Sequence, residues 1–115
     1  AAAAAAFEGD QSCLIDMVNS FKERHDFVVG ALNEMPGVRC HHGDGTFYAF
    51  ADVSAAIEHI DGVSDDVEFC AYLLEQAQVA MVPGSAFGMK GCVRMSYATD
   101  MASLEKAMDR MAKAL

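Results

Sequence analysis

The sequence predicts an α+β fold, a two-layer sandwich in which helices pack on one face of a small sheet. A long stretch of apolar residues at helical spacing is followed by two strand-like runs joined by a glycine-rich turn. A second helical stretch, two more strand-like runs and an amphipathic last helix complete the order α-β-β-α-β-β-α. The chain of 115 residues is long enough for one domain.

The first long helix is predicted from apolar positions that alternate in steps of four and three. They are Leu14, Val18, Phe21, His25, Val28, Leu32 and Met35. Asp10 is suited to cap its start, and Pro36-Gly37 forbids its continuation. Residues 1–9 are assigned to a low-complexity linker end, in which Ala1–Ala6 fits either a frayed helix or a stretch of unassigned side chains. The folded domain is therefore expected to span residues 10–115.

Four strands are predicted, the first two as a hairpin. Gly43-Asp44-Gly45 separates residues 38–42 from residues 46–52, and an Asp-Gly pair between apolar runs is a strong hairpin signal. The second run is apolar on both alternating faces, which predicts a central place in the sheet. Residues 79–83 and 92–98 are the third and fourth strands.

Two more helices are predicted from their caps and spacing. Residues 54–64 are expected to be a linker ending in Ser64-Asp65, and Asp65 with Glu68 has the spacing of a capping box. The seam of the following helix is predicted to be Val67, Cys70, Ala71 and Leu74. Asp100 is expected to cap the last helix, whose seam is Leu104, Met108, Met111 and Leu115.

The composition narrows the class of partner. The formal net charge of −9 repels phosphate backbones and anionic membranes, so we expect neither a nucleic-acid nor a membrane partner. No stretch is apolar enough for a membrane span, and no signal-peptide pattern opens the chain. The four cysteines are scattered without a C-x-x-C motif, which predicts reduced core thiols in a cytoplasmic protein. The apolar fraction of 53% is consistent with a surface that something else covers, although the eight methionines and the alanines at the start account for much of the excess.

Arg94 is the main candidate for a binding residue. Side chains alternate along a strand, so Val93, Met95 and Tyr97 share the face that can pack on helices. Arg94 and Ser96 lie on the opposite face, where a guanidinium can hold a carboxylate through two parallel hydrogen bonds. Composition alone favours a solvent-facing arginine with no ligand.

Several motifs in order resemble the end of class I pyridoxal-phosphate-dependent aminotransferases, with the closest likeness to the bacterial aspartate aminotransferase branch. They are "FKERHDFVVGALNEMPGV", "GDGTFYAFADVS", "VPGSAFG" and "VRMSYAT", followed by the terminal amphipathic helix. The likeness runs from about Gly9 to Leu115. It implies that residues 10–115 are a C-terminal small domain that closes over the substrate, beside a large domain that is absent here and holds the pyridoxal 5'-phosphate cofactor.

The resemblance also assigns roles to residues. It implies that Arg94 binds the substrate α-carboxylate and makes Phe87 a candidate for the substrate entrance. It brings Phe47 and Tyr48 to the active-site mouth, although core packing explains those two aromatic residues equally well. The implied substrates are an amino acid, aspartate in the first place, and a 2-oxo acid such as 2-oxoglutarate. The implied assembly is a homodimer of the full-length enzyme.

The chemistry of the family needs a lysine for the Schiff base, and this chain has no lysine in such a context. Lys22, Lys106 and Lys113 fall on charged helical stretches, and Lys90 lies in the glycine-rich loop. We therefore expect no catalytic and no cofactor-binding residue in this chain, and no turnover by the chain alone. The alternatives are a free-standing regulatory module that binds a small carboxylate, the small domain of a related lyase or acyltransferase, and a purely structural interaction domain.

The remaining motifs point less specifically to a function. The serine of "GSAFG" stands one place early for a G-x-S-x-G elbow, so a tight turn explains its glycines. Cys40-His41-His42 offers metal ligands, but neighbours on a strand point to opposite faces, so we expect no metal site. His25 lies on the helix stripe and is predicted to be a packed, hydrogen-bonded histidine.

Overall fold

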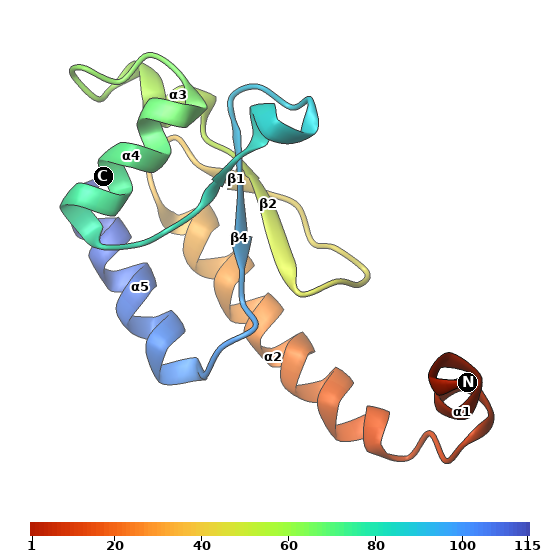
Figure 1. Ribbon diagram of the computed structural model, residues 1–115. Coiled ribbons are helices and arrows are strands. Elements are labelled where there is room, and N and C mark those ends of the chain that lie inside the picture. Colours follow the sequence, from red (N-terminus) through yellow and green to blue (C-terminus); the bar gives the residue numbers. More distant parts are fainter.

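The computed structural model describes residues 1–115 and confirms the α+β class (Figure 1). The predicted order is present, with two short α-helices and a 3-10 helix added to it. The elements are α1 Ala2–Glu8, α2 Cys13–Glu34, β1 Arg39–Cys40, β2 Tyr48–Asp52, α3 Ser54–Glu58, α4 Asp66–Ala77, β3 Val82–Pro83, the 3-10 helix η1 Gly84–Phe87, β4 Cys92–Ser96 and α5 Met101–Ala114. All four strands are shorter than predicted.

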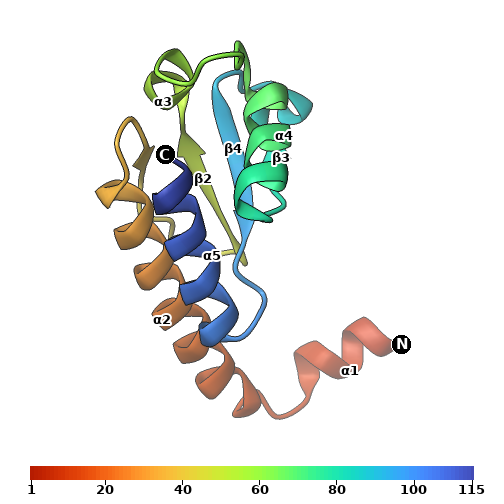
Figure 2. The same ribbon diagram turned by 90° about the vertical axis from the view of Figure 1, so that its left-hand side faces the viewer.

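The sheet is antiparallel throughout and has the strand order β1-β2-β4-β3. The central position predicted for β2 is therefore confirmed. Helix α5 packs between α2 and α4, and the three helices lie on one face of the sheet (Figure 2). Phe50 of β2 pairs with Arg94 of β4, and Ala51 pairs with Val93. This register places the small residues of β2 and the apolar face of β4 against the helices.

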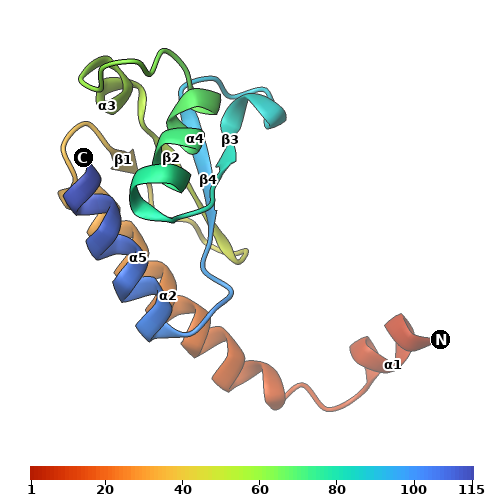
Figure 3. The same ribbon diagram turned by 60° about the vertical axis from the view of Figure 1, so that its left-hand side comes forward.

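Helix α2 begins later than predicted and leaves its first half uncovered. Asp10 does not cap it; its carboxylate accepts hydrogen bonds from the N–H and the hydroxyl of Ser12, at 2.9 and 2.6 Å. Leu14 and Val18 are 41% and 60% exposed, because the first turns extend beyond the sheet together with α1 (Figure 3). Burial begins only at His25. The predicted stripe is thus a core stripe in its second half alone.

Helix α3 was predicted to be part of a linker, and this prediction is wrong. The turn after α2 packs against it: the N–H of Ala56 donates to the carbonyl of Gly37 at 3.1 Å. Gly37 has a φ of +76°, and a Cβ there would lie 2.5 Å from the Ala56 nitrogen, so the contact requires glycine. A helix of five residues is too short to display a periodic pattern, which is why the sequence missed it.

Helix α4 has the predicted cap and a different buried face. The carboxylate of Asp65 accepts a hydrogen bond from the N–H of Glu68 at 2.8 Å, as predicted, but Glu68 bonds back to Ser64 and not to Asp65. The buried apolar side chains are Phe69, Cys70, Leu73 and Ala77, whereas Val67 and Leu74 are exposed. Apart from Cys70 the predicted seam was one residue out of phase, because the helix meets the sheet along the neighbouring stripe.

The last helix agrees with its prediction. Asp100 caps α5 by accepting a hydrogen bond from the N–H of Ser103 at 3.1 Å. Leu104, Met108 and Met111 are buried against the rest of the core, and Leu115 is half-buried.

All four cysteines are free thiols, and burial differs among them. Cys40 and Cys70 are buried, Cys92 is half-buried and Cys13 is exposed, so the prediction of core thiols is right for two positions and wrong for Cys13. Burial raises the pKa of the Cys70 thiol to about 11, and the nearby Asp66 carboxylate adds to the effect.

None of the helices has both the length and the apolar composition that a membrane span requires.

Candidate functional site

Arg94 lies on the face of the sheet that the helices leave open. Its neighbours on β4, Val93 and Met95, are buried on the helical side, so the predicted alternation is confirmed. The Arg94 side chain is half-buried and makes no hydrogen bond and no ion pair with the rest of the chain. Its five N–H donors are therefore free for a ligand.

Two aromatic rings lie against the guanidinium. The Cζ atom of Arg94 is 5.0 Å from the ring centroid of Tyr48, which comes from β2, and 4.5 Å from that of Phe87, which ends η1. The Phe87 ring meets Phe50 edge-on, with centroids 6.3 Å apart. Both distances to Arg94 fall within the range of a favourable cation–π contact. Two rings from segments far apart in the sequence thus meet at one positive charge.

Phe87 lies in a loop whose N–H groups are hydrogen-bonded to a buried carboxylate. Asp66 is 2% exposed and accepts hydrogen bonds from the N–H groups of Ser85, at 2.8 Å, and Gly91, at 3.4 Å. Burial raises the pKa of Asp66, but these N–H donors outweigh it and leave the pKa below its ordinary value. Gly84 allows the close turn, since a Cβ there would lie 2.4 Å from the carbonyl oxygen of Met89. The loop from Gly84 to Gly91 is therefore held at both ends.

The acidic residue on the same face of the neighbouring strand β2 binds groups other than Arg94. Asp52 lies on the same face of β2 as Tyr48 and pairs in register with Cys92. Its carboxylate accepts the N–H and the hydroxyl of Ser54, at 2.9 and 2.6 Å, and forms an ion pair with Arg39 at 3.3 Å. The Ser54 hydrogen bonds, helped by Arg39, lower the pKa of Asp52. Asp52 therefore stays charged without neutralising the guanidinium on the next strand.

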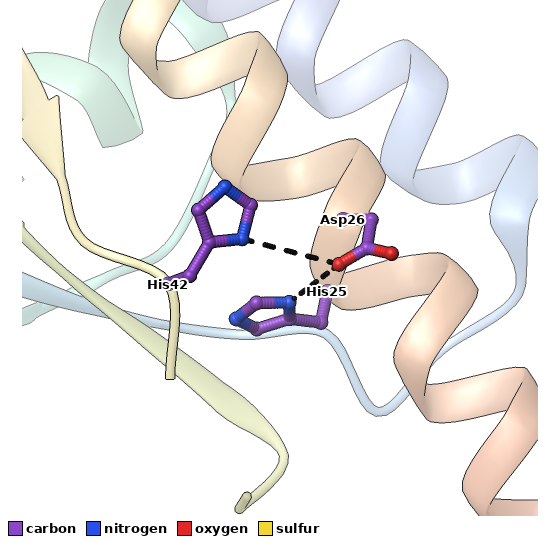
Figure 4. A group of neighbouring side chains, drawn as sticks. All are labelled: His25, Asp26 and His42. Atoms are coloured by element: carbon purple, nitrogen blue, oxygen red, sulfur yellow. Dashed lines mark hydrogen bonds and ion pairs between the residues drawn. The ribbon is translucent and has the colours of Figure 1, made fainter. Parts of the chain in front are cut away.

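A second polar cluster joins α2 to the loop before β2 (Figure 4). His25 is buried; its Nε2 accepts the N–H of Gly43 at 2.9 Å, and its Nδ1 lies 3.0 Å from Oδ1 of Asp26. The Nδ1 of His42 is 4.0 Å from the same oxygen. Because Nε2 accepts, Nδ1 carries the proton and donates to Asp26, so neither His25 nitrogen has a lone pair left for a metal ion. The prediction of a packed, hydrogen-bonded His25 is confirmed.

The run Cys40-His41-His42 does not converge on one point. The Cys40 thiol is buried and donates to the carbonyl of Phe50 at 3.5 Å, whereas His41 and His42 are exposed.

The lysines do not form a site for a Schiff base. All four are exposed; Lys22 pairs with Asp26 at 3.0 Å and Lys113 pairs with Asp109 at 2.8 Å. A Schiff-base lysine needs a desolvated or otherwise activated amine, which no lysine here has. The residues of this chain therefore do not fit as the holder of a pyridoxal cofactor.

Sequence reasoning located Arg94 and missed much of its surroundings. Phe47 is 49% exposed and packs edge-on against Tyr48, so neither ring belongs to the core. The contact between Tyr48 and Arg94 could have been found from strand alternation once the register was known. Asp66 carried no signal, because an acid in the first turn of a helix is ordinary.

The chain is similar in sequence to known proteins of one family. Residues 1–111 match the family described as aminotransferase class I and II. The chain is 47% identical over 119 residues to an aspartate/prephenate aminotransferase of Nitrosomonas europaea, which covers 99% of this chain and 30% of that protein.

Solved structures give the same result. The crystal structure of an aspartate aminotransferase from Rhizobium meliloti superposes with a TM-score of 0.91 at 41% identity, over 98% of this chain and 29% of that one. An alanine aminotransferase from Pyrococcus furiosus gives a TM-score of 0.85 at 32% identity, over 95% and 27% of the two chains. The chain thus spans less than a third of the length of the proteins that it matches.

Proposed function

Because this chain belongs to the aminotransferase class I and II family, we propose that it is the C-terminal small domain of a longer pyridoxal-phosphate-dependent aminotransferase. In this proposal Arg94 binds the α-carboxylate of the amino-acid and 2-oxo-acid substrates. The observation that supports this role is the placement of the Arg94 side chain and the absence of a partner for it within the chain. A guanidinium that is half-buried, has no acid partner and faces away from the helices can meet a planar carboxylate with two charge-assisted hydrogen bonds.

The uncovered half of α2 supports the presence of a further domain. Ile15, Met17 and Val18 are 64%, 51% and 60% exposed, and Phe7 of α1 is 84% exposed. Several large apolar side chains exposed on neighbouring helices are unusual on a free-standing domain and typical of a surface that another domain covers. The remaining two thirds of the enzyme are the proposed cover. Those parts would hold pyridoxal phosphate, since the exposed lysines of this chain do not.

The residues of this chain bind and orient the substrate. A bidentate contact to the carboxylate fixes the substrate in two directions, which a point charge on a lysine cannot do. Closure of this domain over the remainder of the enzyme would keep water from the bound substrate. Phe87, half-exposed beside Arg94, is well placed to line the approach.

The proposed substrates are aspartate and 2-oxoglutarate. The name of the Nitrosomonas europaea relative supports aspartate. A protein of similar fold is named an alanine aminotransferase, so the fold of this domain is compatible with a different amino-acid substrate. A homodimer and a cytoplasmic location complete the proposal; the four free thiols support the location.

The experiment compares Arg94→Lys and Arg94→Gln with wild type in the full-length enzyme. We expect the KM for both substrates to rise about a hundredfold in Arg94→Gln, because a desolvated charge pair is lost. The rise should be smaller in Arg94→Lys, which keeps the charge and loses the bidentate contact. Arg110→Lys is the control, since Arg110 is exposed on α5 and has no ion partner. An unchanged KM in both Arg94 variants would overturn the carboxylate role. Transaminase activity, or the visible absorption of a lysine–cofactor Schiff base, from the 115-residue chain alone would contradict the assignment as a fragment.

A further inference from the structure

We propose that Tyr48 and Phe87 are positioning residues that hold the Arg94 guanidinium in place for the carboxylate. We call these two residues the aromatic clamp. This inference rests on the proposed function and goes beyond it, because it says what orients the arginine.

A binding arginine needs a support that does not use its hydrogen-bond donors. An acidic partner would orient the guanidinium, but it would also compete with the substrate carboxylate for the same N–H groups. An aromatic ring attracts the positive charge through its π face and leaves those donors free. The distances of 5.0 Å to Tyr48 and 4.5 Å to Phe87 place the charge of Arg94 against both rings.

The two rings reach Arg94 from separate, well-held elements. Tyr48 belongs to the central strand β2 and pairs in register with Ser96, two residues from Arg94. Phe87 stands at the end of η1, in the loop whose N–H groups at Ser85 and Gly91 are bound by the buried Asp66. Neither ring is free to follow the arginine if it swings away, so together they limit its rotamers.

The exposure of Phe87 argues against a role in core packing alone. Its side chain is 50% exposed, although the hydrophobic core of the domain lies on the other face of the sheet. Met89 in the same loop is 54% exposed, and no aromatic or ionic contact joins it to Arg94. The two residues therefore form a matched pair: one is in the clamp and the other is not.

The test uses the full-length enzyme and four clamp variants. Phe87→Leu and Tyr48→Leu remove a ring, while Phe87→Tyr and Tyr48→Phe keep it; Met89→Leu is the control. Measured quantities are kcat, the KM for aspartate and 2-oxoglutarate, and the inhibition constant of succinate as a non-reacting carboxylate. We expect the leucine variants at the clamp to raise KM and the succinate constant about threefold to tenfold, with kcat little changed. The ring-keeping variants should retain most of the affinity that the leucine variants lose, and the Met89→Leu control should resemble wild type.

A double-mutant cycle separates the clamp from a general packing effect. In an Arg94→Gln background, where no charge remains to be held, Phe87→Leu should have almost no further effect on the succinate constant. If the leucine variants keep wild-type constants while Arg94→Lys loses affinity, the clamp is refuted and the proposed function stands. If neither Arg94→Lys nor Arg94→Gln loses affinity, the proposed function itself fails. A loss of kcat and thermal stability that Phe87→Tyr does not rescue would show a structural role and also refute the clamp.

Discussion

Asp52 and Arg94 lie on the same face of neighbouring strands, one diagonal step apart, and no ion pair joins them. Diagonal neighbours in an antiparallel pair are about 7–8 Å apart, within reach of an arginine side chain. Asp52 and Arg94 do not pair because the Asp52 carboxylate is already bound by Ser54 and Arg39. A local turn motif thereby keeps the Arg94 guanidinium free of the acid on the same face of the neighbouring strand.

Replacing Ser54 by alanine should weaken carboxylate binding indirectly. The change removes the hydroxyl that donates to Asp52 at 2.6 Å, so the carboxylate gains freedom to pair with Arg94. We expect the KM of the full-length enzyme for both substrates to rise about twofold to fivefold, because competition from a half-exposed ion pair changes the binding free energy by that order. Ser103→Ala is the control, because it removes an equivalent Ser–Asp bond, to Asp100, on α5. Equal KM values in the two variants would contradict this explanation.

Replacing Asp66 by asparagine should destabilise the fold and reduce its sensitivity to acid. The amide has one acceptor oxygen for two N–H groups, so at pH 7 the free energy of unfolding should fall by about 1–3 kcal/mol. The pKa of Asp66 is lower in the folded chain than in the unfolded one. Its stabilising effect is therefore complete above the unfolded pKa, about 3.9, and is lost as the pH falls through the folded value.

Urea unfolding of wild type and Asp66→Asn at pH 7 and pH 3 measures this effect. The difference between the two proteins should be large at pH 7 and smaller at pH 3. Asp61→Asn, a change at an exposed position, should follow wild type at both values. A difference that does not depend on pH would mean that the Asp66 charge contributes nothing.

Removing the cap of α5 should lower the melting temperature more than removing an ion pair from the same helix. Asp100→Ala leaves the N–H of Ser103 without its partner, and we expect the melting temperature to fall on the order of 5 °C. Asp109→Ala breaks an exposed pair with Lys113 and should shift it by a degree or less. Thermal unfolding followed by circular dichroism compares them, and equal shifts would contradict the capping role.

The two histidines of the second cluster should differ in their effect on stability. His25→Ala leaves the N–H of Gly43 unsatisfied and removes the edge contact with Tyr97, whose centroid is 5.9 Å away, so we expect a loss of about 1–3 kcal/mol. His42→Ala changes a side chain that is 70% exposed and should stay within about 0.5 kcal/mol. Denaturant titration distinguishes them; a large effect at His42 would refute this assignment.

The sequence predicted those features that depend on local periodicity and caps. Strand alternation placed Arg94 on the open face, and the caps at Asp65 and Asp100 were predicted because an acid just before a helix commonly accepts its first N–H groups. The same rule failed at Asp10, which binds Ser12 and does not cap α2. The family resemblance added the role of Arg94, which periodicity alone could not supply.

What the sequence missed depends on tertiary contacts. The buried face of α4 follows Phe69 and Leu73 because of where the sheet lies, and both candidate stripes are apolar. The exposure of Leu14 reflects the absence of anything packed on it, which a hydrophobic pattern cannot reveal. The contact of Phe87 with Arg94 requires the loop held by Asp66, and that bond joins residues 19 positions apart.

Both edges of the sheet are too short to recruit another chain. The edge strands β1 and β3 have two residues each, and β3 ends in Pro83, which has no N–H to offer. An edge of this kind gives an approaching strand almost no ladder to extend, a protection that natural sheets commonly use against aggregation. Contacts of this domain with other chains therefore have to use side chains instead of strand pairing, and exposed apolar residues such as Ile15 and Val18 of α2 are available for them.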